Sequence, residues 1–407
     1  MRRITVLLLT IVPIISLIPF LNSYDTQNTR FEEMDRLFKQ AVDEGIVPGV
    51  VAIVADGKRI LYHNAFGKMD VKNDIDMDKN ALFDIASMTK AFTSVGVMML
   101  YERGEFELDD PVSKFIPSLK NFHVLNRFDS SNSTFTTVPS DKEITIRQLL
   151  THTSGFGYFF ISVPLSKIIS KTGMAWGELP LLHQPGEKWT YGISTDVLGD
   201  LIEVVTGVTL DVFFKENLFD PLGMTDTFYN IPEEKFNRLI TRHRRTENGV
   251  LTEFENVKPK QNNIPTGGHG IYTTATDYLK FLQMLLNGGE ANGKRFVSSE
   301  TLNLMTTNQI GNLPVEPMIS SNSRLTNDFV FIDGKDKFGF GFLIEANPKP
   351  YMRSLGSYSW VGIYNTYFWV DPKKKVAAIF LTRIQPFCDD QVLKLYSDFE
   401  SMVYKSI

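Results

Sequence analysis

The sequence predicts an α/β protein whose sheet is completed by both ends of the chain, with a mostly helical region inserted between them. Strands near the N-terminus are indicated by two β-rich runs, VPGVVAIVA and KRILYHNAFG, which flank a hairpin signal at Asp56-Gly57. Strands near the C-terminus are indicated by the runs FGFGFLIEA, NTYFWV and KVAAIFLT. Because helical patterns fill the middle third, both groups of strands are expected to pair in one sheet.

The first part of the chain opens with a helix. Apolar residues at helical spacing predict an amphipathic helix over Phe31–Glu44, which Gly45 ends. After the two strands, a further helix begins within the run FDIASMTKAFTSVGVMM. The polar stretch from Lys120 to Lys142 is rich in Ser, Thr and Asn and is expected to form a long loop or a domain boundary.

The middle and the end of the chain predict more helices. They are expected at ITIRQLLTHTSG, Thr195–Thr206, Asp211–Leu218, Pro232–His243, Thr276–Asn287 and, closing the chain, Asp389–Tyr404. The expected division is a leader or anchor over 1–23, an α/β domain formed by 24–115 and 270–407, and a mostly α-helical domain over 116–269.

Composition excludes several classes of function. The chain has 407 residues, 43% hydrophobic and 22% charged, which is typical of a globular protein. Its net charge of -5 and the absence of a basic run argue against nucleic acid as a partner. The single Cys388 excludes an internal disulfide, and the six histidines show no metal-ligand spacing, so neither a metal nor another cofactor is expected.

The N-terminus predicts export. Arg2 and Arg3 precede an apolar run over Ile4–Leu21, after which polar sequence begins. The run is long for a cleaved signal and lacks a good cleavage site, so an uncleaved membrane anchor is the alternative. In either case the folded body is expected to be periplasmic or extracellular, and a membrane is expected as a partner only through this segment.

The run that contains Ser87 and Lys90 carries the predicted chemistry. A serine followed three residues later by a lysine places both side chains on one face of a helical turn. The surrounding residues are apolar, and burial disfavours the charged form of a lysine, so the amine can accept the hydroxyl proton. Ser87 is therefore a candidate nucleophile and Lys90 its activator. The amides of a first helical turn also lack intrahelical partners and can stabilise a developing oxyanion.

Two distant segments supply the remaining groups of such a site. Tyr191 lies in PGEKWTYGISTDVLGDLIE just before a helix, and a neighbouring lysine ammonium would favour its phenolate, so it is a candidate proton relay. The run GSYSWVGIY precedes the strand NTYFWV, and a backbone amide at its end could provide a second oxyanion donor.

In combination these segments resemble the serine hydrolases that recognise penicillin. Further runs, among them LFDPLGMTDT and GGHGIYTTATDYLKFLQMLLNGG, are similar to the β-lactamase-related branch that includes class C β-lactamases and family VIII carboxylesterases. The resemblance covers the chain from Phe31 onward. It implies the β-lactamase/transpeptidase-like fold: an antiparallel sheet flanked by helices, an all-α insert domain, and a site between them. It also implies Ser87 as the acylated nucleophile, Lys90 and Tyr191 as the base, and the amides of Ser87 and Ile363 as the oxyanion hole.

Departures from the β-lactamase pattern indicate an esterase. Gly192 and Ile193 follow the tyrosine where a β-lactamase has an asparagine two residues on. Trp360, Val361 and Gly362 stand where the family has Lys-Thr-Gly, so the cation that grips a substrate carboxylate is missing. Ile193, Trp360, Val361 and Gly362 are the expected substrate-binding positions.

The expected reaction is therefore hydrolysis of a small-molecule ester or amide, most simply a short-chain ester, through an acyl-enzyme on Ser87. The alternatives are a β-lactamase or D-amino-acid peptidase, and a non-catalytic binding or assembly protein on the same scaffold. The resemblance also implies a structural role for the HTSG segment that contains His152. No G-x-S-x-G run supports a Ser-His-Asp triad.

Overall fold

The structure is a computed structural model that describes residues 18–254, 264–330, 335–347 and 350–407. Its centre is an eight-stranded sheet in which every neighbouring pair is antiparallel. In sheet order the strands are β12 (Lys337–Phe338), β13 (Leu343–Ile344), β14 (Tyr358–Gly362), β15 (Thr366–Asp371), β16 (Val376–Leu381), β1 (Gly49–Ala55), β2 (Ile60–Asp70) and β3 (Ile75–Asp76). The mixed α/β fold with a sheet built from both chain ends is confirmed.

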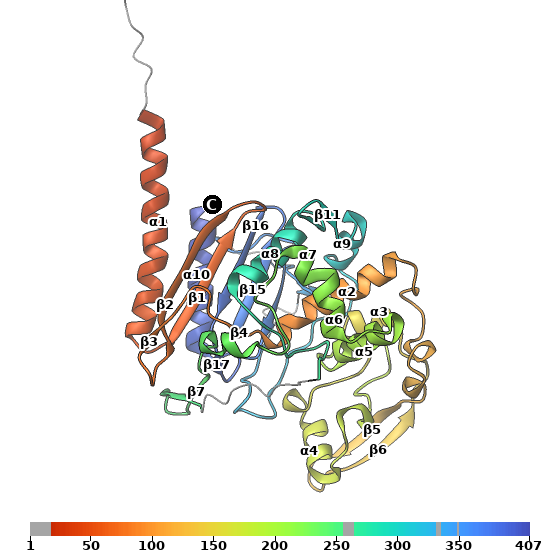
Figure 1. Cartoon of the computed structure of the whole chain (residues 1–407). Helices are drawn as coiled ribbons and strands as arrows, with labels where there is room; N and C mark the ends of the chain where they lie inside the picture. Colours follow the sequence, from red (N-terminus) through yellow and green to blue (C-terminus); the bar gives the residue numbers. More distant parts are fainter. Residues whose placement is uncertain (1–17, 255–263, 331–334, 348–349) are drawn as a thin grey trace, which may run out of the picture.

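The pairing of β1 with β16 joins the two ends of the chain at the middle of the sheet. Ile53 lies opposite Ile379, and Val51 opposite Leu381. Every residue of β1, β15 and β16 is buried, because helices cover both faces of the sheet. One face carries α1 (Ile18–Asp43) and α10 (Asp390–Ser406), which lie side by side in Figure 1.

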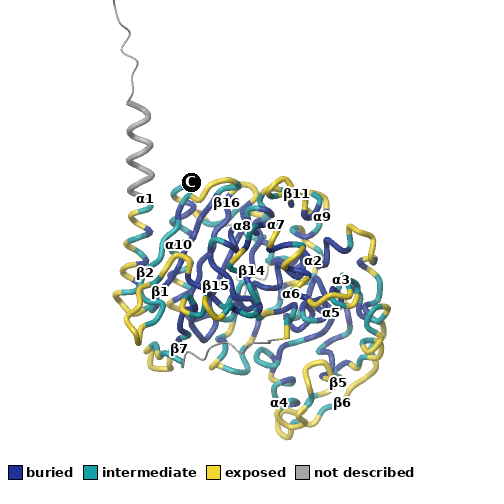
Figure 2. Tube along the Cα trace, viewed as in Figure 1, coloured by how far each residue is buried: buried dark blue, intermediate teal, exposed yellow. Residues whose placement is uncertain are grey.

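The other face of the sheet carries α8 (Ala275–Leu286), and α2 (Thr89–Glu102) lies beyond it in the interior. Every residue of α2 from Thr89 to Leu100 is buried, and Figure 2 shows the same dark colour over this helix and the central strands. The helix that bears Lys90 is thus a core element.

The inserted part of the chain forms a second lobe beside the sheet (Figure 1). Its elements are β5 (His123–Asp129), β6 (Thr134–Pro139), α3 (Ile146–Leu150), α4 (Val163–Thr172), α5 (Ser194–Thr206), α6 (Leu210–Phe214) and α7 (Asp220–Leu222). Shorter elements elsewhere are β10 (Glu290–Ala291), β11 (Lys294–Arg295) and α9 (Ser299–Met305).

Two expectations for this region were wrong. The stretch Lys120–Lys142 is not a long loop: β5 and β6 form a hairpin, since Phe128 and Phe135 face each other and pack against the core of α4. The second wrong expectation is a helix over Pro232–His243, which the structure does not contain.

There the structure has only a 3₁₀ turn, Glu233–Arg238, followed by β7 (His243–Arg245). Leu82 exchanges backbone hydrogen bonds with Arg238 and Ile240, and these bonds hold the chain extended. β7 then pairs with β8 (Leu251–Glu253) and, in parallel, with β17 (Ile384–Gln385).

The N-terminal leader lies largely outside the described residues. Helix α1 runs without a break from residue 18 to residue 43, across the expected end of the leader at residue 23, and its first half extends away from the body in Figure 1. Among the described residues, no helix combines the length and the hydropathy that a membrane span requires.

Candidate active site

The segment that presents Ser87 has a strained backbone. Ala86 adopts a left-handed φ of 43°, which costs a non-glycine residue about 1 kcal/mol or more and persists only where neighbouring contacts impose it. The Ala86 N–H donates a hydrogen bond of 3.1 Å to the Asp84 carboxylate. Ser87 follows within the 3₁₀ turn Ala86–Met88, which leads directly into α2. The backbone conformation of Ala86 and of the turn that follows therefore fixes the position of Ser87, the candidate nucleophile.

Lys90 lies one turn further along, as its spacing from Ser87 predicts, and its side chain is buried. Its Nζ lies 3.2 Å from Ser87 Oγ, 3.2 Å from Tyr158 Oη and 2.8 Å from the carbonyl oxygen of Gly268. A carbonyl oxygen can only accept, and the Tyr158 hydroxyl donates elsewhere. Both of these oxygens accept hydrogen bonds from Nζ, and together they hold the amine against Ser87 Oγ.

Tyr158 is a residue of the site that the sequence did not identify. Its hydroxyl donates to Asp196 Oδ2 at 3.2 Å, and Asp196 Oδ1 accepts the Gly268 N–H at 3.1 Å. Lys90, Tyr158, Asp196 and Gly268 thus form a closed ring of hydrogen bonds. Burial, with the Asp196 charge next in importance, raises the pKa of Tyr158 well above its usual value. Tyr158 therefore stays protonated and positions the lysine.

Two glycines allow this ring to close. A Cβ on Gly268 would lie 2.5 Å and 2.6 Å from the Asp196 carboxylate oxygens, and a Cβ on Gly267 would lie 2.1 Å from the carbonyl oxygen of Thr195. The GGHG segment can approach the start of α5 only without side chains at these positions. The Thr93 hydroxyl also donates to the Gly267 carbonyl at 2.7 Å. The loop is therefore held from both sides.

Tyr191 lies in the same cavity as Ser87, although its hydroxyl makes no bond to Lys90. Lys90 Nζ lies 5.1 Å from the centroid of the Tyr191 ring, and the Tyr158 and Tyr191 rings meet edge to face with centroids 5.3 Å apart. Among the described residues, the Tyr191 hydroxyl has no hydrogen-bond partner. The structure thus brings Ser87, Lys90 and Tyr191 together, but the hydroxyl that contacts the lysine is that of Tyr158.

His152 supports the Tyr191 ring from behind. The two rings pack edge to face with centroids 5.1 Å apart, and His152 is buried outside the lining of the cavity. Burial, followed by the Lys90 charge, lowers the pKa of His152 well below its usual value. A neutral, buried imidazole in this place agrees with the structural role that the family resemblance implies for the HTSG segment.

Neither of the two expected oxyanion donors bonds to a backbone acceptor of the described residues. Ala86 donates to Asp84 and Met88 donates to the Ile85 carbonyl, but the Ser87 amide between them donates to no backbone acceptor of the described residues. The same holds for the amide of Ile363, which follows the end of β14. Both residues line the cavity. Gly362 permits this approach, since a Cβ there would lie 2.4 Å from the Ile85 carbonyl oxygen.

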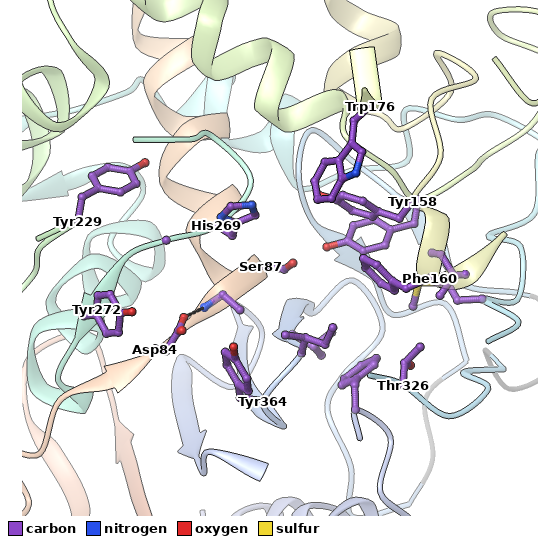
Figure 3. Close-up of a pocket in the computed structure, with 18 of the residues that line it drawn as sticks. Asp84, Ser87, Tyr158, Phe160, Trp176, Tyr229, His269, Tyr272, Thr326 and Tyr364 are labelled. Atoms are coloured by element: carbon purple, nitrogen blue, oxygen red, sulfur yellow. Dashed lines mark hydrogen bonds between the residues drawn. The ribbon is translucent and has the colours of Figure 1, made fainter. Parts of the chain in front are cut away.

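The cavity has a volume of about 450 Å³ and two ends of different character. Figure 3 shows Ser87 between them: the aromatic end holds Tyr158, Phe160 and Trp176, and the polar end holds Asp84, His269, Tyr272 and Tyr364. Further lining residues are Ala86, Ile161, Tyr191, Tyr229, Ile264, Gly270, Met318, Thr326, Val361, Ile363 and Phe387. None of these lining residues is a lysine or an arginine.

The expected substrate-binding positions are divided between the lining and the layer behind it. Val361 lines the cavity. Ile193, Trp360 and Gly362 are buried and do not line it. Trp360 instead packs edge to face on Tyr191, with centroids 5.1 Å apart. No cluster of three His, Cys, Asp or Glu side chains that could hold a metal ion occurs within the ranges that the structure describes.

Comparison with known proteins places this site in a family. The sequence model named Beta-lactamase matches residues 34–400. The chain belongs to the beta-lactamase family. Within this family the chain is 26% identical to ML-236A carboxylate methylbutanoyltransferase mlcH of Penicillium citrinum, over 97% of this chain and 99% of that one. It is also 26% identical to the lovastatin esterase of Penicillium rubens, over 91% of this chain and 98% of that one.

A solved structure agrees with the beta-lactamase-like fold. The LovD6 mutant of simvastatin synthase from Aspergillus terreus matches with a TM-score of 0.82 and 26% identity, over 92% of this chain and 97% of that one. This beta-lactamase-family chain is thus an enzyme of the β-lactamase/transpeptidase-like superfamily, as its sequence motifs predicted. The family includes proteins named as hydrolases and as acyltransferases, and both act on small-molecule acyl compounds.

Proposed function

We propose that this protein is an exported serine esterase that cleaves short-chain carboxylic esters through an acyl-enzyme on Ser87. The observation that carries the proposal is the 3.2 Å contact between Ser87 Oγ and a buried Lys90 whose other neighbours are two hydrogen-bond acceptors. A serine needs an adjacent base to become nucleophilic, and this amine is aimed at it.

The reaction has two halves. In the first, the Ser87 proton passes to Lys90 Nζ as Oγ bonds to the acyl carbon, and the ester C–O bond then breaks. The departing alkoxide recovers the proton from Lys90 by way of the Tyr191 hydroxyl, which lines the same cavity; since this hydroxyl has no protein partner among the described residues, the relay requires that it contact Lys90 once the ester is bound. In the second half, a water molecule takes the place of the alcohol. It passes a proton to Lys90 as it attacks the acyl carbon, and the bond from the acyl carbon to Ser87 Oγ then breaks, so that Oγ recovers the proton and the acid is released.

Negative charge on the carbonyl oxygen is stabilised by backbone amides. The Ser87 and Ile363 N–H groups donate to no other backbone acceptor of the described residues, and both residues line the cavity that contains the nucleophile, which supports this role. Loss of one of them typically costs about 10² to 10³ in kcat.

The lining of the cavity favours an ester over a β-lactam or a D-alanyl peptide. Both of those substrates carry a carboxylate, and a cation must neutralise it. Among the residues that the structure describes, no lysine or arginine lines this cavity, and the Asp84 carboxylate lines it instead. The aromatic end, with Trp176 and Phe160, suits an uncharged acyl group.

The proposal is tested with chromogenic substrates and mass spectrometry. p-Nitrophenyl acetate and butyrate are expected to be hydrolysed, and a fluorophosphonate is expected to add one adduct to Ser87. Ser87→Ala is expected to lose both. Unchanged turnover in Ser87→Ala would exclude the mechanism. Faster turnover of nitrocefin or of a D-Ala-D-Ala peptide than of the esters would favour the β-lactamase or peptidase alternative, and absence of any adduct would favour a non-catalytic protein.

Transfer of the acyl group to an alcohol is a second candidate function. The cavity extends on both sides of Ser87, so an acyl group and an alcohol can occupy it together. The aromatic side chains of the lining bind water weakly, which favours an alcohol over water as the acceptor of the acyl group. The similarity to a methylbutanoyltransferase supports this candidate. Product analysis in the presence of added alcohols separates the two functions, since transfer yields a new ester in place of the free acid.

Export remains part of the proposal on sequence grounds alone. The basic residues Arg2 and Arg3 and the apolar run after them support it. Fractionation of cells that express the whole chain, with and without residues 2–21, measures where the activity is found. Equal activity in the cytosolic fraction of both would contradict export.

A further inference from the structure

The polar end of the cavity contains a carboxylate that the proposed reaction does not use. Asp84 lies three residues before the nucleophile, at the end of β4 (Phe83–Asp84), where it pairs with Tyr272 of β9 (Tyr272–Thr273). Its side chain is 14% exposed and lines the cavity. One oxygen, Oδ1, accepts the Ala86 N–H at 3.1 Å. Asp84 is therefore fixed relative to Ser87 by the strained backbone between them.

The groups around Asp84 leave room for a ligand hydrogen bond. Figure 3 shows its carboxylate between the side chains of Tyr272 and Tyr364, with His269 on the other side toward Ser87. Apart from the Ala86 amide, its nearest described charge partner is Arg383, whose Nη2 lies 3.9 Å from Oδ2. That distance is an ion pair without a hydrogen bond. A donor that enters from the cavity can therefore reach the carboxylate.

The charged side chains behind Asp84 and Tyr364 decide which kind of ligand group fits. Arg383 donates from Nη1 to the Ile240 carbonyl, and Arg242 donates from Nη1 to the Tyr364 hydroxyl at 3.3 Å. Both arginines stack near the Tyr364 ring, at 5.8 Å and 5.9 Å from its centroid. Two guanidinium groups and one carboxylate leave a surplus positive charge, which disfavours a cationic ligand.

An anionic ligand is disfavoured too, because the group that faces the cavity is the carboxylate. Burial raises the pKa of Asp84, and Arg383, the Ala86 amide, His269 and Arg242 oppose that effect. A neutral group that donates a hydrogen bond meets neither penalty. An alcohol hydroxyl is such a group, and the Tyr272 phenol beside it adds a second polar contact.

We infer that Asp84 binds a free hydroxyl group in the alcohol part of the substrate, so that the natural ester is a partial ester of a polyol or of another hydroxylated alcohol. The inference rests on the proposed function and deepens it. The acyl group then occupies the aromatic end beside Trp176, and the alcohol occupies the polar end, on the opposite side of Ser87 (Figure 3). In acyl transfer the same end would hold the accepting alcohol.

The experiment compares two esters of similar size on the purified, full-length protein. Glycerol 1-monobutyrate carries free hydroxyls in its alcohol part, and n-butyl butyrate carries none. The wild-type protein is expected to prefer the glycerol ester in kcat/KM by about tenfold, since a buried hydrogen-bonding group that is left without its partner discriminates by this order. Asp84→Asn keeps the acceptor for the Ala86 amide but weakens the ligand bond. It is expected to lose most of that preference, chiefly through a higher KM for the glycerol ester.

A matched control comes from Asp78, which is exposed and accepts the Asn80 N–H at 2.7 Å with the same two-residue spacing. Asp78→Asn is expected to keep the preference. An equal loss on both esters in Asp84→Asn, or no preference in the wild type, would overturn the inference. Preference for butyrylcholine would also overturn it, because that ester tests a cationic alcohol part. If no ester is cleaved and Ser87 takes no adduct, it is the proposed function itself that fails.

Discussion

Lys90 Nζ lies 2.8 Å from the carbonyl oxygen of Gly268, a residue 178 positions later in the chain. This contact joins the helix of the nucleophile to the GGHG segment, which in turn binds Asp196 at the start of α5. The lysine is therefore oriented by three separate parts of the chain. Its position depends on the backbone of Gly268 as much as on the S-x-x-K turn.

Gly268→Ala is expected to damage both activity and stability. The new Cβ would lie about 2.5 Å from the Asp196 carboxylate, so the loop must shift and the carbonyl that holds Lys90 must move with it. We expect kcat on p-nitrophenyl butyrate to fall at least about tenfold and the free energy of unfolding to fall by about 1–3 kcal/mol. Gly177→Ala is the control, since a Cβ there meets nothing within 4 Å. Equal effects in both variants would contradict the role of Gly268.

The two tyrosines of the site are expected to give different kinetic defects. Tyr158→Phe removes an acceptor from Lys90 and a donor to Asp196, so the base is misplaced and kcat is expected to fall about tenfold to a hundredfold with little change in KM. Tyr191→Phe removes the relay hydroxyl, for which about 10² to 10⁴ is typical. A larger loss in Tyr158→Phe than in Tyr191→Phe would reverse the two assignments.

The raised pKa of Tyr158 makes a further prediction about pH. Because burial keeps this phenol protonated well above its usual range, its ionisation cannot produce a change in kcat between pH 6 and about pH 10. Any rise or fall of kcat with pH in that range must also be present in Tyr158→Phe. A rise or fall that disappears in this variant would show that Tyr158 titrates after all.

Stability is expected to fall as the solution becomes acidic. Burial lowers the pKa of His152, His183 and His243, whereas a histidine of the unfolded chain titrates near 6.5. Below that pH the unfolded state binds more protons than the folded state, so the free energy of unfolding rises with pH and is lost as pH falls.

The variant His152→Asn tests this prediction, since asparagine tolerates the positive φ of 55° at that position. Urea titrations measure the free energy of unfolding at pH 7.5 and at pH 5.5. The difference between these two values is expected to be smaller in the variant than in the wild type by up to about 1.4 kcal/mol. His123→Asn changes an exposed histidine and is expected to leave the difference unaltered. A wild-type difference that His152→Asn does not reduce would contradict the assignment.

The ion pair of Arg353 and Glu400 is expected to stabilise the C-terminal helix. Two hydrogen bonds of 2.8 Å and 2.7 Å join the guanidinium to the carboxylate, and Glu400 is 2% exposed. Glu400→Gln leaves a buried arginine without its counter-charge, so we expect the free energy of unfolding to fall by about 3 kcal/mol. Asp398→Asn breaks the exposed pair with Lys394 and should cost less than about 1 kcal/mol. Urea denaturation measures both.

Local chemistry explains which parts of the site the sequence revealed. Ser87 and Lys90 are three residues apart on one helical turn, so their contact follows from helix geometry alone. Tyr191 and Ile363 were located through motifs whose order and spacing resemble a family. Tyr158 has no such local signal: its role comes from contacts with Lys90 and Asp196, which are 68 and 38 residues away.

The errors in the fold have a similar cause. The hairpin of β5 and β6 is polar on its outer face, so its composition resembles a loop, and only the inward packing of Phe128 and Phe135 against α4 shows that it is a sheet. The segment after Pro232 has apolar residues at helical spacing, but its backbone bonds go to Leu82, far away in the sequence. Neither partner can be read from the segment itself.

The pairing of β1 with β16 has a consequence for how the protein folds while it is being synthesised. The ribosome releases Ser87, Lys90 and the rest of their helix long before it synthesises Val376–Leu381, the strand that must lie against β1. Until that strand emerges, the nascent chain exposes an apolar strand edge and an uncovered helix, which are the features that chaperones bind. The catalytic apparatus can therefore assemble only after residues 376–381 have been synthesised, and a premature stop before residue 376 would yield an inactive, aggregation-prone product.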